Sequence, residues 1–122
     1  NLRHPIIERL ITNVEYIGND ISLNQNGILL YGINASGKSS LMKALGLAII
    51  MVQSGMYVPA TSFEFSPYHH IFTRICGNDD IYRGMSSFVV EMSELRNILQ
   101  RADERSLVIG DEICCGTEAI SA

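Results

Sequence analysis

Eight consecutive residues in the first third of the chain constrain its fold more than any other feature. The segment Gly32-Ile-Asn-Ala-Ser-Gly37-Lys38-Ser39 fits the pattern G-x-x-x-x-G-K-[ST] without a gap. Its glycines let the backbone curve so that successive N–H groups face phosphate oxygens, and the positive end of a following helix favours the same charge. The segment therefore predicts a loop that binds the phosphates of a nucleotide.

The residues on either side of this loop have the patterns of a strand and a helix. Residues 27–31 form a short apolar run between Asn26 and Gly32, which is typical of a buried parallel strand. Residues 37–53 carry apolar side chains at helical spacing, and Ser54-Gly55 predicts the end of that helix. The order strand, glycine loop, helix is the one expected around a phosphate-binding loop.

The remaining segments continue the alternation of strands and helices. Residues 71–75 and 106–110 are predicted strands, a polar turn is predicted at 77–80, and the loop at 56–67 is expected to contain a short strand at 61–65. Strands that alternate with helices indicate an α/β fold with a mainly parallel sheet and flanking helices.

Ser86 and Ser87 are predicted to precede a second amphipathic helix. Glu91 and Glu94 in its early turns and Arg101 at its end suit the helix dipole. Its predicted apolar face consists of Phe88, Met92, Leu95 and Leu99.

Four polar side chains are candidates for the chemistry at the loop. Lys38 is expected to reach the β and γ phosphates, and the Ser39 hydroxyl is expected to bind Mg²⁺. Asp111 and Glu112 follow the apolar run 107–110, at the end of a strand where ligands bind in open α/β sheets. Asp111 is expected to hold Mg²⁺ through water, and Glu112 to orient or deprotonate an attacking water. The other nucleotide contacts are assigned to Gly32, Asn34, Ala35, Ser36, Gly37 and Ser40.

Each of these features also has an ordinary structural interpretation. A glycine turn followed by a lysine forms without a ligand, and a strand that ends in Asp-Glu is often only a solvated strand end. The order of the two patterns in one chain favours the functional interpretation. The second carboxylate favours hydrolysis over a small-molecule kinase, whose phosphoryl acceptor is not water.

Composition and charge narrow the class of protein. The 122 residues are 47 % hydrophobic and 18 % charged, as in a globular interior, and carry a net charge of −4. This charge argues against a chain that coats DNA by itself, because binding to the DNA backbone uses clustered Lys and Arg. The longest apolar run, 45–52, is far shorter than the ~20 residues that cross a bilayer, so no membrane partner is expected.

The cysteines and histidines give no sign of a disulfide framework or a metal centre. Cys114 and Cys115 are adjacent, where a mutual disulfide is strained, and are interpreted as a packed, unreactive pair rather than a redox sensor. A reducing compartment is therefore expected: cytoplasm, nucleus, organelle matrix or viral factory. His4 is expected to stabilise its local turn rather than contact nucleotide, and His69-His70 are interpreted as exposed loop residues.

The order of several short strings resembles the ATPase domains of the MutS family of DNA mismatch repair proteins. The resemblance covers nearly the whole chain, and the chain is expected to be the first half of such a domain within a longer protein. Besides the loop, the strings are Arg3-His4-Pro5-Ile6-Ile7-Glu8, Tyr57-Val58-Pro59-Ala60, Ile71-Phe72-Thr73-Arg74-Ile75, Asp79-Asp80, Ser86-Ser87-Phe88-Val89-Val90-Glu91-Met92, Asn97-Ile98-Leu99 and Ser106-Leu107-Val108-Ile109-Gly110-Asp111-Glu112-Ile113.

The resemblance implies a P-loop fold of the ABC-ATPase type that binds ATP or ADP with Mg²⁺. It also implies a homo- or heterodimer with composite sites, and a coupling of nucleotide state to mismatched double-stranded DNA bound by other domains of the parent protein. By the same resemblance, Ser86 reaches the γ-phosphate bound by the opposite subunit, with Ser87 as the second choice; a helix cap is an equally good role. Tyr16 is expected either to stack on adenine or to be an ordinary core tyrosine, and Asn34 to touch phosphate oxygens.

Departures from the common family pattern point to one branch. Ile33, Ala35 and Ser36 replace Pro, Met and Gly, and Cys114-Cys115-Gly116-Thr117 replaces Gly-Arg-Gly-Thr. These variants resemble the divergent branch found in large DNA viruses and octocoral mitochondria.

Two other functions remain open at this point. Another ABC-type DNA-repair or chromosome-structure ATPase is one, although such proteins carry a Ser-Gly-Gly-Gln type signature where this chain has Gly84-Met-Ser-Ser87. The other is an interaction module that binds ATP as a switch without turnover. The 122 residues by themselves are expected to hydrolyse ATP poorly, because half of each composite site would come from a partner.

Overall fold

The chain divides into two structural units, Asn1–Ser66 and Pro67–Ala122. The computed structural model describes residues 1–24, 27–33, 35–75, 87–111 and 113. The predicted polar turn at 77–80 lies outside the described residues.

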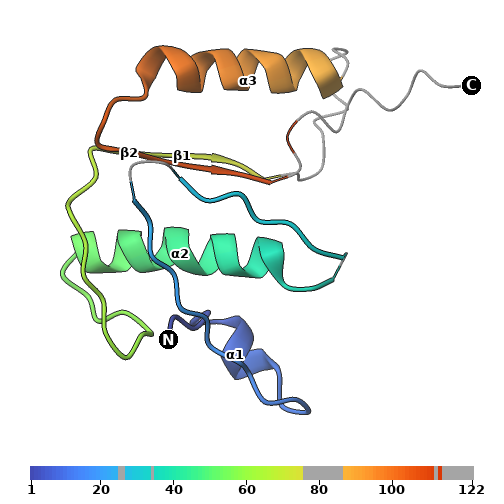
Figure 1. Cartoon of the computed structure of the whole chain (residues 1–122), viewed down its shortest axis with the longest axis vertical. Coiled ribbons are helices and arrows are strands. Elements are labelled where there is room, and N and C mark those ends of the chain that lie inside the picture. The colour runs from blue at the N-terminus through green and yellow to red at the C-terminus, as the bar shows by residue number, and fades with distance from the viewer. Residues whose placement is uncertain (25–26, 34, 76–86, 112, 114–122) are drawn as a thin grey trace, which may run out of the picture. The chain divides into compact units, whose positions relative to one another are not determined.

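The first unit is built around one long helix, α2 (Lys38–Gln53), with a short helix α1 (Ile7–Leu10) near the N-terminus (Figure 1). Gly37 is the N-cap of α2 and has φ 94°, a left-handed conformation that glycine adopts at little cost. At the other end, the Ser54 N–H bonds to Ile50 O and Met51 O, and Gly55 has φ 76°. The helix predicted for residues 37–53 is therefore confirmed, including its end at Ser54-Gly55.

Leu2 joins the N-terminal segment to α2. Its N–H donates to Asn19 O at 2.7 Å, and its carbonyl accepts from the Asn19 N–H at 2.9 Å. Its side chain is buried with Ala44 and Ala48, two small residues one helical turn apart on α2. The hydrophobic residues packed against this cluster are Ile21, Leu45, Val58, Ala60 and Phe63. The N-terminal segment is thus part of the core under the helix that follows the glycine loop.

Two predicted strands of the first unit are wrong. Residues 27–31 belong to no strand, and Leu29 and Tyr31 are 89 % and 91 % exposed. Residues 61–65 also lie outside any strand, and nearby Ala60 makes only an isolated bridge to Leu2. A strand needs a hydrogen-bonded neighbour, and the described part of the chain pairs none with either segment. Apolar composition alone was therefore not enough to predict a strand at either segment.

The second unit contains a parallel pair of strands, β1 (His70–Arg74) and β2 (Ser106–Gly110), connected through helix α3 (Ser87–Arg101) (Figure 1). His70 is opposite Ser106 and Arg74 is opposite Gly110 in the register. Leu107 and Ile109 are buried while Val108 between them is half-exposed, the alternation of a strand with one covered face. The predicted parallel α/β pattern is confirmed here, with the first strand displaced by one residue.

The apolar face predicted for helix α3 is confirmed only in part, because Met92 and Leu95 are half-buried but Leu99 is not. Leu99, placed on the predicted apolar face, is 82 % exposed, whereas Glu91 and Ile98 are buried. Because neighbouring residues differ by about 100° around a helix, burial of Ile98 in place of Leu99 rotates the covered face partly away from the predicted one. Glu91 is consequently an interior side chain rather than a solvated partner of the helix dipole. Glu94 faces β1 instead, with its Oε2 3.2 Å from Arg74 Nε.

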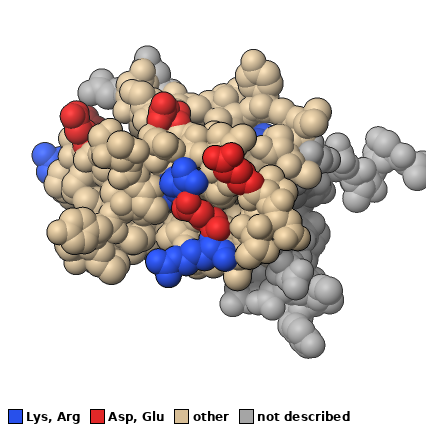
Figure 2. All heavy atoms as spheres, turned by 90° about the horizontal axis from the view of Figure 1, so that it is seen from below, with Lys and Arg blue, Asp and Glu red and all other residues tan. Residues whose placement is uncertain are grey.

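The charged side chains on the face shown in Figure 2 are of both signs and lie interspersed, so this face carries no uniformly basic patch. Among the described residues, no helix is long and apolar enough to cross a membrane.

Candidate phosphate-binding site

The loop between Gly32 and Lys38 has a backbone that few residues adopt without a specific reason. Ala35 has φ 62° and Gly37 has φ 94°, both in the left-handed region. The Ser36 N–H closes the turn on Ile33 O at 3.3 Å. For a residue with a Cβ, such as Ala35, the left-handed conformation costs roughly 1–2 kcal/mol. The rest of the loop therefore holds Ala35 in this conformation against a local preference.

The Lys38 ammonium is bound inside its own loop. Its Nζ donates to Gly32 O at 2.8 Å and to Ile33 O at 2.9 Å. An ammonium group has three donors, and the bonds within the described part of the loop use two of them. The positive charge is thus held at a defined place by the carbonyls of the two residues that begin the motif.

The start of α2 adds backbone donors at the same place. The first helical bond runs from the Leu41 N–H to Gly37 O at 2.9 Å. The N–H groups of Lys38, Ser39 and Ser40 precede that bond, so they have no carbonyl partner within the helix. Because the helix is 16 residues long, its dipole also favours an anion at this end. Lysine charge, open amides and helix dipole all favour the same kind of ligand, an anion such as phosphate.

The other predicted loop residues differ in how far they are exposed. Ser39 and Ser40 are half-buried in the first turn of α2, and Ala35 and Ser36 are exposed in the loop. Asn34 lies outside the described residues.

Asp111 lies directly after β2, in the second unit. Its N–H donates to Arg74 O at 2.7 Å, which extends the parallel ladder by one bond beyond Gly110. Its half-buried side chain therefore belongs to the carboxyl end of the strand pair, the edge at which open parallel sheets bind ligands. Glu112 and Ser86, and the cysteines at 76, 114 and 115, lie outside the described residues.

A cluster of polar side chains surrounds Tyr16 in the first unit. The Arg3 guanidinium carbon lies 5.4 Å from the centroid of the Tyr16 ring, and Arg3 Nη2 donates to Tyr16 O at 2.8 Å. The His4 N–H donates to the Tyr16 hydroxyl at 3.1 Å. Tyr16 is therefore a half-buried ring held at both ends, and neither of these contacts was predicted from the sequence. In the sequence the string Arg3-His4 is only a family landmark, and spacing alone does not show which ring an arginine covers.

His4 caps helix α1, as expected from its predicted role in the local turn. The ring is buried, and Nδ1 accepts from the N–H groups of Ile6 and Ile7, each at 3.2 Å. Burial lowers the pKa of His4 below its usual value, and the nearby Lys43 charge lowers it further. Because protonation of Nδ1 would remove the acceptor of both bonds, the neutral ring is the form that fits.

The histidine pair at 69 and 70 differs from its predicted place in a loop. His70 is the first residue of β1, and only His69 precedes the strand. His69 Nδ1 lies 3.3 Å from Asp103 Oδ2, and its Nε2 lies 3.4 Å from Arg105 Nη1. The largest cause that holds the pKa of Asp103 below its usual value is the hydrogen bond that the Ser106 hydroxyl donates to its carboxylate. His69 alone therefore joins the turn before β2 to the start of β1.

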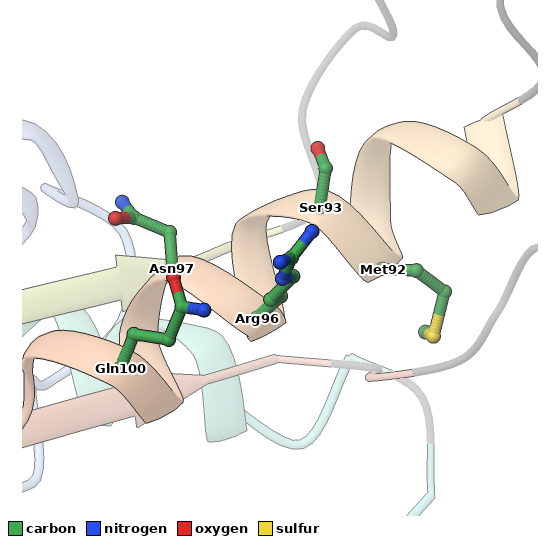
Figure 3. A pocket seen from close by; sticks show the side chains of 5 residues that line it. All are labelled: Met92, Ser93, Arg96, Asn97 and Gln100. Atoms are coloured by element: carbon green, nitrogen blue, oxygen red, sulfur yellow. The ribbon is translucent and has the colours of Figure 1, made fainter.

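An open hollow of about 430 Å³ lies along α3 and is separate from the predicted site residues. All the side chains that line it project from that single helix (Figure 3). They are Met92, Ser93, Arg96, Asn97 and Gln100. Because none is a carboxylate or a residue of the glycine loop, the hollow does not compete with the loop as the candidate for phosphate chemistry.

Comparisons with known proteins agree with the family resemblance found in the sequence. The family model described as MutS domain V matches residues 28–121. A mitochondrial DNA mismatch repair protein mutS homolog from Sarcophyton glaucum is 51 % identical over 121 residues, which are 99 % of this chain and 12 % of that protein. A putative DNA mismatch repair protein mutS homolog from Acanthamoeba polyphaga mimivirus is 41 % identical over an alignment of 158 residues, covering 99 % of this chain and 14 % of that protein. DNA mismatch repair protein MutS from Lactobacillus johnsonii is 47 % identical over 119 residues, 96 % of this chain and 14 % of that protein. The chain thus spans between 12 % and 14 % of the length of these curated relatives.

The His4 cap predicts how stability depends on pH. Since the folded-state pKa is lowered, the unfolded chain binds more protons, and stability falls as pH decreases through about 6.5 toward the lower folded value. Denaturant unfolding of the chain between pH 8 and pH 5 measures this loss. In His4→Asn the side-chain oxygen still accepts from the two amides but does not titrate, so its stability should fall less than that of the wild type. Equal pH dependence of the two proteins would contradict the role of His4, and His69→Asn is the control for a histidine outside the cap.

Proposed function

Because the chain belongs to the MutS family, we propose that it is the nucleotide-binding part of a DNA mismatch repair protein that hydrolyses ATP. The fold proposed for the complete domain is the P-loop fold of the ABC-ATPase type, of which this chain supplies the glycine loop, α2 and a parallel strand pair.

The observation that carries the proposal is the position of the Lys38 ammonium on Gly32 O and Ile33 O. It places a cation at the same loop as the first amides of α2, which have no carbonyl partner within the helix. A nucleotide's phosphates carry the charge and the acceptor oxygens that satisfy this arrangement. In our proposal the backbone of residues 32–40, with the Asn34 side chain, surrounds the triphosphate of ATP or the diphosphate of ADP.

Magnesium and water are assigned to three further side chains. Ser39, at the start of α2, and Asp111, after β2, have the oxygen ligands that Mg²⁺ prefers. Glu112 is the proposed group that orients or deprotonates the attacking water. The position of Asp111 at the carboxyl end of the strand pair supports this assignment, since ligands of parallel sheets bind at that edge.

The proposed partners follow from the family. The parent protein is proposed to form a homo- or heterodimer through this domain, with Ser86 contacting the γ-phosphate held by the other subunit. Mismatched double-stranded DNA is proposed to bind to other parts of the parent protein. The net charge of −4 supports this division, because binding to the DNA backbone relies on clustered positive charge.

Tyr16 is proposed to stack on the adenine base. Its ring is half-buried, and it lies in the same unit as the phosphate loop. Aromatic rings that are partly exposed and firmly held are suited to stacking on a planar ligand.

Removal of the Lys38 ammonium should weaken ATP binding by the parent protein. Loss of one charge-assisted hydrogen bond corresponds to about 10- to 100-fold in affinity, so Lys38→Met should raise the Kd for ATP by that factor in equilibrium titration. Lys43→Met is the matched control, because Lys43 is an exposed lysine of the same helix. If the two substitutions raise the Kd equally, Lys38 has no specific role in ATP binding.

Hydrolysis separates the ATPase from a nucleotide switch without turnover. If Glu112 positions water, Glu112→Gln should lower phosphate release by the parent protein about 10²- to 10⁴-fold while ATP binding is retained. Glu104→Gln, in the exposed turn before β2, is the control carboxylate. A wild-type parent protein that binds ATP but releases no phosphate would favour the switch instead.

A further inference from the structure

Arg3 makes contacts that hold it against Tyr16. Its Nε donates to Glu8 Oε1 at 2.6 Å, and its Nη2 donates to Tyr16 O at 2.8 Å. The guanidinium carbon lies 5.4 Å from the centroid of the Tyr16 ring, within the range of a cation–π contact. The side chains of Arg3 and Glu8 are 33 % and 35 % exposed, so solvent screens the contacts only in part. One face of the ring is thus occupied by a cation whose orientation a carboxylate fixes.

The remaining contacts attach this ring to α2. The Tyr16 hydroxyl accepts from the His4 N–H, and Leu2, two residues before His4, packs on Ala44 and Ala48 of α2. Ala44 is six residues after Lys38, which corresponds to about 9 Å along a helix axis. The ring is therefore connected to the helix that begins at the phosphate loop only through residues 2–4, and displacement of Arg3 would act on the ring without touching Lys38.

We propose that Arg3, held by Glu8, is a positioning residue that fixes the Tyr16 ring as a stacking surface for the base of the bound nucleotide. The inference rests on the proposed function, because the phosphates must occupy the loop at 32–39. With the guanidinium on one face, the base would stack on the opposite face of the ring. A cation on one side of a ring also draws electron density toward itself, which favours an electron-rich purine on the other side.

The geometry requires an arginine. A guanidinium is planar and presents several donors in a rigid fork, so it can bond to a carboxylate and a carbonyl while its plane lies against a ring. A lysine ammonium in place of Arg3 would keep the charge and the ion pair with Glu8. It would not make all of these contacts together, so charge and geometry can be separated by substitution.

The test compares two ligands that share their phosphates but differ in the base. The Kd of the parent protein for MgATP and for magnesium tripolyphosphate is measured by calorimetric titration, in the wild type and in Arg3→Met, Arg3→Lys and Tyr16→Leu. Arg3→Met and Tyr16→Leu should weaken ATP binding about three- to tenfold and leave the tripolyphosphate affinity unchanged. Arg3→Lys should show most of the same loss. Arg9→Met, an exposed arginine of α1, is the matched control and should change neither affinity.

The two ligands distinguish failure of this inference from failure of the proposed function. Equal loss for both ligands in Arg3→Met would show a structural role only and would overturn the inference, as would no loss for either. Full ATP affinity in Arg3→Lys would overturn the role of the planar fork. If the wild type binds the two ligands equally, the base-stacking surface is refuted but the phosphate site is retained. If the wild type binds neither ligand, the phosphate site itself is refuted.

Discussion

The candidate site depends on the hydrogen bonds that the Lys38 ammonium donates to two backbone carbonyls of its own loop. A loop that brings Gly32 O and Ile33 O to the same nitrogen must curve tightly, and the left-handed backbone at Ala35 and Gly37 supplies that curvature. The same curvature leaves the first amides of α2 open. Removal of the charge would therefore leave two carbonyls without their donor and an anion site without its cation.

The sequence predicted those elements whose stability comes from local pattern. Helix α2 and strand β2 lie where spacing and composition placed them, because helical periodicity, glycine positions and a β-branched run are all local signals. The loop motif likewise specifies its own backbone. The family was also predicted from short strings, and the match of MutS domain V to residues 28–121 confirms it, together with relatives from a mitochondrial and a viral source. The roles of Ser39, Asp111 and Glu112 in binding magnesium and water stay predictions.

Features that depend on distant partners were not predicted correctly. Residues 27–31 have the composition of a strand but lack a paired neighbour among the described residues, and composition cannot show which segment pairs with which. On α3, Ile98 is buried rather than Leu99, because the neighbouring sheet, not the helix alone, decides which side faces inward. Arg3 and Tyr16 are 13 positions apart, and no periodic pattern in the sequence indicates that the arginine lies over the ring.

The measurement that tests the account most directly is a crystal structure of the parent protein with Mg²⁺ and a non-hydrolysable ATP analogue. We expect Lys38 Nζ to donate to a β- or γ-phosphate oxygen, and Ser39 Oγ to lie about 2.1 Å from the magnesium ion. We also expect Asp111 within one water molecule of that ion. Phosphates bound away from residues 32–39, or a magnesium ion coordinated without Ser39 and remote from Asp111, would contradict this account.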